Sequence, residues 1–140
     1  MPLRADFKTR LEAIAKGINL PTEVSWWELP TGLWKRACLL TPAGAGQIWT
    51  HEGVNALVNP RVQIDWYAEK QSEASALYEA CLLQLQDVAS VTVGGTEFLP
   101  PFELNMHLFD TDQIGGTESS PGRKVYRAMQ DFSFFAQPAA

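Results

Sequence analysis

Length, composition and charge exclude several classes of protein. The chain has 140 residues, of which 46% are hydrophobic and 19% are charged; such a composition is typical of one packed domain and not of a disordered chain. The net charge of −5 argues against a protein that grips a nucleic-acid backbone, because such proteins carry basic faces. No apolar run is long enough for a signal peptide or a membrane span, so we expect a cytoplasmic product without membrane contact.

The first part of the chain predicts a helix followed by two strands. Apolar residues recur every three or four positions from Leu3 to Ile18, which is the spacing of one helical face, and Pro21 follows as a stop signal. Residues 23–28 and 33–41 are rich in Trp, Val and Leu and flank a turn that contains Pro and Gly. We therefore expect two strands here.

The middle of the chain gives the strongest local signal. After an expected loop at residues 42–60, residues 61–67 alternate between polar and apolar side chains, as in a half-buried strand. The apolar period then changes to that of a helix, which we expect to start at Ser72 as its N-cap and to run to about Val88.

The last third predicts β structure. Residues 91–99 indicate a hairpin centred on a Gly-Gly pair, because paired glycines allow the positive φ angles of a tight turn. Residues 102–108 and 126–134 alternate as strands do, and a long polar loop is expected between them at residues 110–122. Residues 136–140 are expected to be frayed.

Together these elements predict an α+β fold. We expect a single domain, residues 1–140, in which an antiparallel β-sheet is flanked by an N-terminal helix and a central helix. Cys38 and Cys81 lie far apart inside apolar segments, so we expect both to be reduced and buried.

The sequence contains no local catalytic or metal-binding motif. It lacks a phosphate-binding GxxxxGK, an HExxH and a CxxC. Asp110 and Asp112 begin like a calcium loop, but the glutamate that should close such a loop is missing. We therefore predict no enzymatic activity, no metal and no cofactor. A small enzyme or ligand-binding module built around His51 or His107 is the alternative from another functional class.

Tryptophan is abundant for one small domain. Trp26 and Trp27 are neighbours on an expected strand, so one ring must point away from the core side of the sheet. Either the N-terminal helix covers it or it belongs to a subunit interface, where Trp is enriched. The candidate interface residues are Trp26, Trp27, Trp34 and Trp49.

Two stretches resemble the tail terminator (tail completion) proteins of long-tailed bacteriophages. Residues 59–68, NPRVQIDWYA, with the helix that follows from Glu73, resemble the central strand and helix of that family. Residues 125–135, VYRAMQDFSFF, resemble its closing strand. The resemblance implies an antiparallel sheet flanked by helices and a six-fold ring on the finished tail tube. Such a ring ends tube polymerisation and presents the surface to which the head docks.

The resemblance also implies partners and a location. It implies a homohexamer at the head-proximal end of the virion tail, assembled in the host cytoplasm, in contact with the tail tube protein and with head–tail connector proteins. An acidic chain suits a ring through which DNA slides without specific binding. A head–tail joining (neck) protein and a regulatory binding domain are alternatives. We expect the loop at 110–122 to face the lumen or the tube, through Asp110, Thr111, Asp112, Gln113, Glu118, Arg123 and Lys124.

Overall fold

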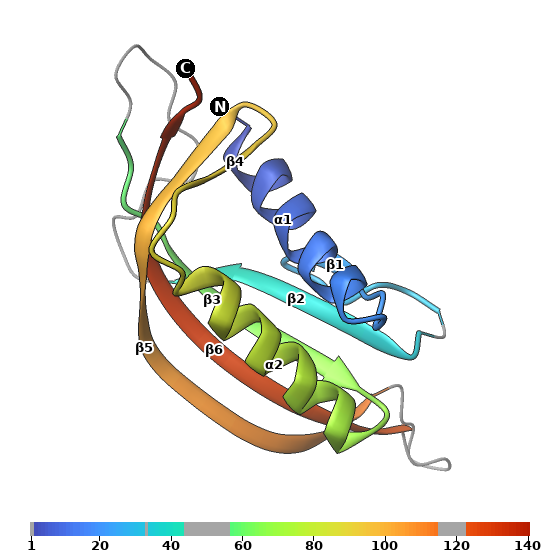
Figure 1. The fold of residues 1–140 in the computed structure, drawn as a ribbon. Coiled ribbons are helices and arrows are strands. Elements are labelled where there is room, and N and C mark those ends of the chain that lie inside the picture. The colour runs from blue at the N-terminus through green and yellow to red at the C-terminus, as the bar shows by residue number, and fades with distance from the viewer. Residues whose placement is uncertain (1, 33, 44–56, 115–122) are drawn as a thin grey trace.

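A computed structural model describes residues 2–32, 34–43, 57–114 and 123–140. Two helices and six strands make up this part of the chain (Figure 1). In chain order they are α1 (Leu3–Gly17), β1 (Glu23–Trp26), β2 (Arg36–Pro42), β3 (Arg61–Ala68), α2 (Gln71–Leu85), β4 (Val91–Val93), β5 (Thr96–Ile114) and β6 (Arg123–Pro138).

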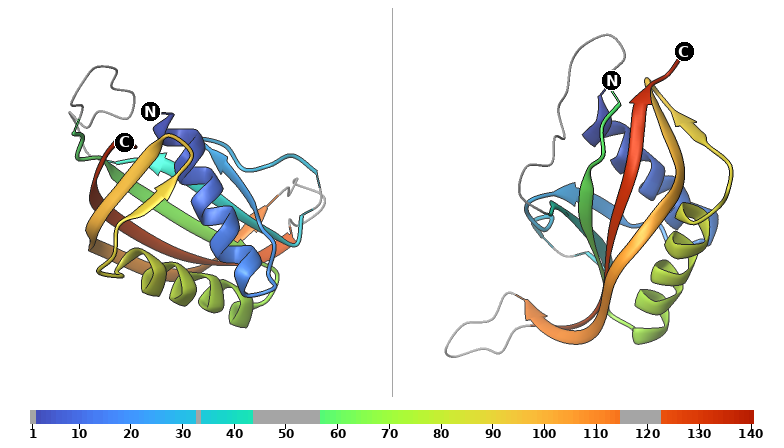
Figure 2. Two further views of the ribbon diagram at one scale, coloured as in Figure 1. Left: turned by 45° about the horizontal axis from the view of Figure 1, so that its top comes forward. Right: turned by 90° about the vertical axis from the view of Figure 1, so that its left-hand side faces the viewer.

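The six strands form one mixed sheet in the order β1-β2-β3-β6-β5-β4. The sheet curls like half of a barrel around α1 and α2, which both lie on its inner face (Figures 1 and 2). β1 runs parallel to β2, and every other pair is antiparallel. The predicted fold class, an α+β protein with an antiparallel sheet, is therefore wrong: the structure is mostly β, and its sheet is mixed.

The parallel pairing of β1 with β2 follows from the burial of Trp34. The backbone turns at Trp27, which has a φ of 73°. Trp34 is then buried on the outer face of the sheet, where its ring packs 6.2 Å from that of Tyr67 and its Nε1 donates to the Pro30 carbonyl. Because Trp34 is held at this place, β2 starts beside the beginning of β1. Glu23 therefore pairs with residue 37, and the two strands do not form a hairpin.

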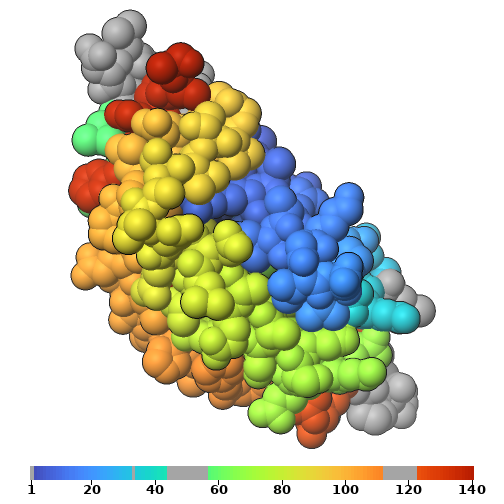
Figure 3. Space-filling model, viewed as in Figure 1, coloured from blue at the N-terminus to red at the C-terminus, as the bar shows by residue number. Residues whose placement is uncertain are grey.

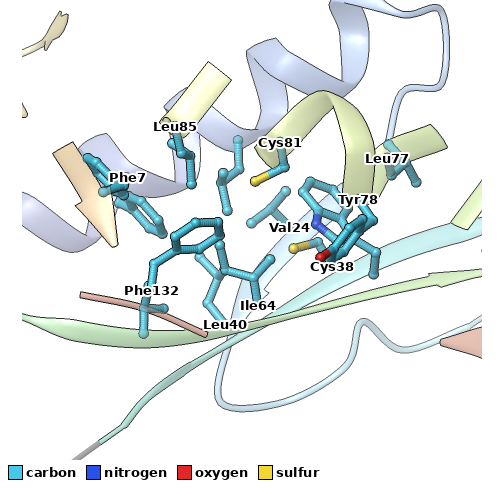
Figure 4. Close-up of a cluster of buried hydrophobic side chains, with 14 of the residues drawn as sticks. Phe7, Val24, Cys38, Leu40, Ile64, Leu77, Tyr78, Cys81, Leu85 and Phe132 are labelled. Atoms are coloured by element: carbon cyan, nitrogen blue, oxygen red, sulfur yellow. The ribbon is translucent and has the colours of Figure 1, made fainter. Parts of the chain in front are cut away.

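The core lies between the two helices and the inner face of the sheet (Figure 4). Burying a large apolar side chain contributes roughly 1.5–3 kcal/mol, so this cluster supplies most of the driving force for folding. Its fully buried members include Phe7 and Leu11 from α1, Leu77, Cys81 and Leu85 from α2, and Leu40, Ile64, Trp66 and Phe132 from the strands.

The two predicted helices are both present, with differences at the ends of the second. α2 begins after Lys70, and no side chain caps it, so the predicted Ser72 cap is wrong. α2 also ends at Leu85, and Val88 lies beyond it with 89% of its surface exposed. Neither helix of the described residues is long and apolar enough to cross a membrane.

Helix α1 connects the two edges of the curled sheet. The Asp6 carboxylate accepts hydrogen bonds from the backbone N–H of Gly95 at 3.2 Å and from the hydroxyl of Thr96 at 2.6 Å, in the β4–β5 turn. At the other edge, Trp26 Nε1 donates to the Arg4 carbonyl at 3.0 Å. α1 thereby closes the open side of the half-barrel between β4 and β1.

The last two strands are longer than predicted. β5 continues to Ile114 and pairs there with Arg123, so the predicted loop is wrong for residues 110–114, which belong to the strand. Residues 115–122 of the predicted loop lie outside the described residues. Polar side chains do not prevent strand pairing here, because antiparallel strands pair through their backbone N–H and C=O groups. The predicted fraying is also wrong up to Pro138, since Ala136 pairs with Phe98 and Val58.

Both cysteines are free and buried, as predicted. Burial raises the pKa of the Cys38 and Cys81 thiols well above the ordinary value of a cysteine. Because the thiolate is the reactive form, these two side chains are protected from oxidation and alkylation while the protein is folded.

The β4–β5 turn gives a first prediction. A Cβ on Gly94, which has a φ of +57°, would lie 2.4 Å from an oxygen of Asp6. Gly94→Ala should therefore lower the free energy of unfolding by about 1–3 kcal/mol, as measured by urea denaturation. Gly17→Ala is the matched control, because nothing lies within 4 Å of its added Cβ. Equal effects of the two substitutions would contradict the role given to this turn.

Candidate functional site

The distal part of the β5–β6 ribbon is the candidate site. We call residues 106–114 of β5 and 123–131 of β6 the β5–β6 arm; they pair with each other throughout. The far end of the arm bends away from the two helices (Figure 2, right). The arm therefore places part of the sheet where another molecule can reach it.

A β-bulge at Asn105 changes which side chains face outward. Leu104 pairs with Phe132 on the inner face, but the register shifts at Asn105, and Met106 then pairs with Asp131 on the outer face. The Asn105 amide stabilises the bulge by donating to the Ser133 hydroxyl at 2.8 Å. Bulges increase the local twist and reverse the alternation of side chains beyond them. The apolar residues that follow are consequently turned away from the core.

Apolar side chains are exposed along the arm. Met106 and Leu108 lie on its outer face and are 50% and 45% exposed. Asp110 continues the same row, two residues further along, with 42% of its side chain exposed. On the inner face, Phe109 is 49% exposed although its ring packs edge-on against Tyr78 at 4.8 Å. Apolar surface of this kind on a sheet edge is typical of a protein-binding site.

The outer edge of β5 has no strand beside it over most of its length. β4 pairs only with residues 96–98, and in the part of the chain that the structure describes residues 99–114 pair only with β6. An unpaired edge presents backbone N–H and C=O groups that another strand can bind. Edge strands are usually protected by Lys residues, but β5 contains neither Lys nor Arg.

Ion pairs fill the outer face of the neighbouring strands. Arg61 forms two hydrogen bonds to the Asp131 carboxylate, at 2.9 and 3.0 Å, and Arg127 Nε binds Asp65 at 2.7 Å. The hydrogen bond and charge of Asp131 raise the pKa of Arg61. Burial by itself would lower the pKa of Arg127, but the hydrogen bond and charge of Asp65 raise it. These arginines hold β3, β6 and β5 together.

The structure places the predicted loop residues on this arm rather than in a loop. Asp110 and Thr111 are exposed on β5, and Asp112 and Gln113 continue the same strand. Glu118 lies outside the described residues. The predicted interaction segment therefore begins as a pair of hydrogen-bonded strands.

Arg123 and Lys124, the basic residues predicted at this site, contact aromatic rings of the same chain. The Arg123 guanidinium lies 4.4 Å from the centre of the Trp34 ring and also donates to the Trp34 carbonyl. The ammonium of Lys124 lies 5.4 Å from the ring of Tyr126. Arg123 thus helps to anchor the arm on the connection between β1 and β2.

The four candidate interface tryptophans differ in exposure. Trp26 is half-buried against Phe7 under α1, and Trp34 is only 7% exposed. Trp27, in contrast, is 56% exposed. The helix thus covers one ring of the Trp26–Trp27 pair, while the other stays available for an interface. Trp49 lies outside the described residues.

The two histidines are the candidate residues of the alternative, enzymatic hypothesis. His107 is exposed beside Tyr78 and Phe109, with ring centres about 6 Å away, so it lies on the inner face of the sheet. His51 lies outside the described residues. Within the described ranges, no three His, Cys, Asp or Glu side chains come together in a group that could hold a metal ion.

Comparison with known proteins gives one partial similarity. No model of a known protein family matches the chain. A stretch of 91 residues, 63% of this chain, is 37% identical to adenosylhomocysteinase from two strains of Halobacterium salinarum. That stretch corresponds to 21% of the enzyme, so the chain spans about a fifth of the length of the curated relatives it matches. Part of the chain is therefore similar to part of an enzyme.

These comparisons correct the family assignment made from the sequence. No family model matches, and the similarity found is to part of an enzyme and not to a phage tail terminator, so the assignment based on residues 59–68 and 125–135 is wrong. Both stretches are strands in the core of the sheet, β3 and β6. Alternating apolar residues on a buried strand are required by packing in many unrelated folds, which explains how such a resemblance arises.

The two carboxylates that share Arg127 give a second prediction. Asp65 is 2% exposed and lies 2.7 Å from Arg127, whereas Asp110 is 42% exposed and lies 3.6 Å from it. Asp65→Asn should lower the free energy of unfolding by about 1–3 kcal/mol, since it weakens a buried charged hydrogen bond. Asp110→Asn should change it by less than about 0.5 kcal/mol. Urea denaturation of both variants, at a protein concentration low enough to keep the chain monomeric, tests this difference, and a large loss for Asp110→Asn would show that Asp110 stabilises the monomer.

Proposed function

We propose that this chain is a non-catalytic structural subunit that self-associates through its β5–β6 arm. The observation that carries the proposal is the edge of β5, which combines an unpaired backbone over residues 99–114 with the exposed side chains of Met106, Leu108 and Phe109. An exposed apolar edge left uncovered leads to uncontrolled aggregation. A specific partner for this edge removes that liability.

The distribution of charge favours a head-to-tail contact between copies. Residues 91–114 contain four acidic side chains and no Lys or Arg. Residues 3–42, which form α1, β1 and β2 at the other edge, contain six Lys or Arg and four Asp or Glu. Two β5 edges placed together would bring like charges into contact, whereas a β5 edge against the α1 side brings opposite charges together. Head-to-tail contacts form closed rings when the rotation between copies allows it.

In its most specific form, the proposal is a ring that caps a phage tail tube, ends its polymerisation and provides the surface for head docking. The ring would be a homohexamer in the virion, at the head-proximal end of the tail, in contact with the tube protein and head–tail connector proteins. The net charge of −5 supports a lumen that lets DNA pass without binding it. The projecting arms support contacts with a neighbouring ring or tube. A neck protein between head and tail is the nearest alternative.

Self-association gives a third prediction. Wild-type protein should sediment as an oligomer whose mass is a multiple of 15.5 kDa. Leu108→Lys should shift it towards the monomer, because it places a charge within the apolar row of the arm. Val88→Lys is the matched control, since Val88 is exposed but lies outside the arm. A wild-type chain that is monomeric at all concentrations would refute the proposal.

The role at the tail gives a fourth prediction. Deletion of the gene from a phage or prophage that carries it should yield overlong tails without heads beside filled heads, as scored by electron microscopy. A milder change, deletion of residues 113–120, should leave the fold intact but block tail maturation. Tails of normal length that fail to join heads would favour the neck protein instead. If the gene deletion and the deletion of residues 113–120 both still give infectious particles, the tail-cap hypothesis and the neck-protein hypothesis are both contradicted.

The partial similarity to adenosylhomocysteinase favours a second candidate function, a domain that binds adenosylhomocysteine. Titration calorimetry with that compound distinguishes the two candidates. Saturable binding by the monomer would favour the second candidate over the structural one.

A further inference from the structure

A groove between the two helices contains a buried arginine whose guanidinium is incompletely paired. The groove has a volume of about 350 Å³ and lies between α1, α2 and β4 (Figure 3). Its walls are mostly apolar and include Ala13, Ile14, Ala80 and Val93, and Arg10 lies among them. Arg10 is the charged member of the lining.

Arg10 is 7% exposed, and its Nη1 has no hydrogen-bond partner. Its Nη2 makes one long hydrogen bond, 3.4 Å, to the Gln84 carbonyl, and the guanidinium lies 5.2 and 5.1 Å from the ring centres of Phe98 and Phe102. Within the described residues Arg10 forms no ion pair, and burial lowers the pKa of Arg10 to about 10. Burying an incompletely paired guanidinium lowers the stability of the folded chain, and a carboxylate in the groove would supply the missing hydrogen-bond acceptor.

The outer face of the arm carries a pattern that matches the groove. Met106, Leu108 and Asp110 form one row of two apolar side chains and one carboxylate. Residues two apart on a strand are about 6.6 Å from each other. Asp110 is available, because its contact to Arg127 is 3.6 Å long while Asp65 binds the same arginine at 2.7 Å.

We propose that the groove between α1, α2 and β4 binds the arm of a second copy of the chain, with Asp110 of that copy paired to Arg10. The inference rests on the proposed self-association and names its receptor surface. Leu108 of the second copy then lies against Ala13 and Ile14.

Disulfide trapping between two single-cysteine additions tests the placement directly. One chain carries Ala13→Cys and the other Leu108→Cys, and both positions are exposed in the monomer. The native Cys38 and Cys81 can remain, because they are buried and unreactive. Mild oxidation of the mixture should give a heterodimer. If Leu108→Cys pairs only with itself, the arms meet each other, and the groove is not the receptor although self-association stands.

Charge variants provide the second test. Asp110→Asn and Arg10→Met should each weaken association by about thirtyfold or more, and the double variant should be little worse than either, as measured by sedimentation. Arg10→Met should leave the thermal midpoint unchanged or raised, since it removes an incompletely paired buried charge. If Arg10→Met fails to fold, Asp110→Asn and the trapping experiment still test whether the arm of a second copy binds in the groove.

The remaining outcomes separate the inference from the proposed function. Wild-type association that neither charge variant weakens would overturn the inference alone. A monomeric wild-type chain would overturn the proposed function and this inference together. A shift of the amide resonances of the groove residues by hexanoate, without any effect of Asp110→Asn on association, would show that the groove binds free carboxylates and not a second copy.

Discussion

The packing of Phe7 beneath a curled sheet is the interaction on which the rest of the structure depends. A half-barrel leaves an open side, and its inner face is lined with aromatic rings that must be kept from water. Helix α1 fills that opening, and Phe7 is fully buried within 7 Å of rings from both ends of the sheet. The hydrogen bonds of Asp6 and Trp26 then hold α1 to the two edges. The rings around Phe7 are Trp26, Phe98, Phe102 and Phe134.

The curled sheet also explains how β5 contributes side chains both to the core and to the exposed arm. The first half of β5 contributes Phe98 and Phe102 to the core. Beyond the bulge at Asn105 the strand leaves the core, and its apolar side chains become surface. A register shift of one residue is sufficient, because side chains on a strand alternate between its faces. One strand therefore contributes apolar side chains to the core before the bulge and to the surface after it.

Charged side chains are divided in a similar way. Asp65 and Asp131 are buried and hydrogen-bonded to arginines of neighbouring strands, so their charges are used within the chain. Asp110 and Arg10 have weaker or missing partners. Incompletely satisfied groups lower the stability of a monomer and are retained when another molecule completes them. This difference in pairing is what distinguishes the candidate interface from the supporting network.

The sequence by itself determined the two helices, most of the strands and the burial of both cysteines, because apolar periodicity and turn residues report local structure. Tertiary structure decided the rest. The parallel β1–β2 pair depends on the distant contact of Trp34 with Tyr67. Met106 and Leu108 face outward because of the bulge at Asn105. The sequence does not reveal this bulge, since apolar and polar residues alternate without interruption over residues 102–108. The incomplete pairing of Arg10 depends on how α1 and α2 meet β5, and one-dimensional patterns carry no record of such long-range contacts.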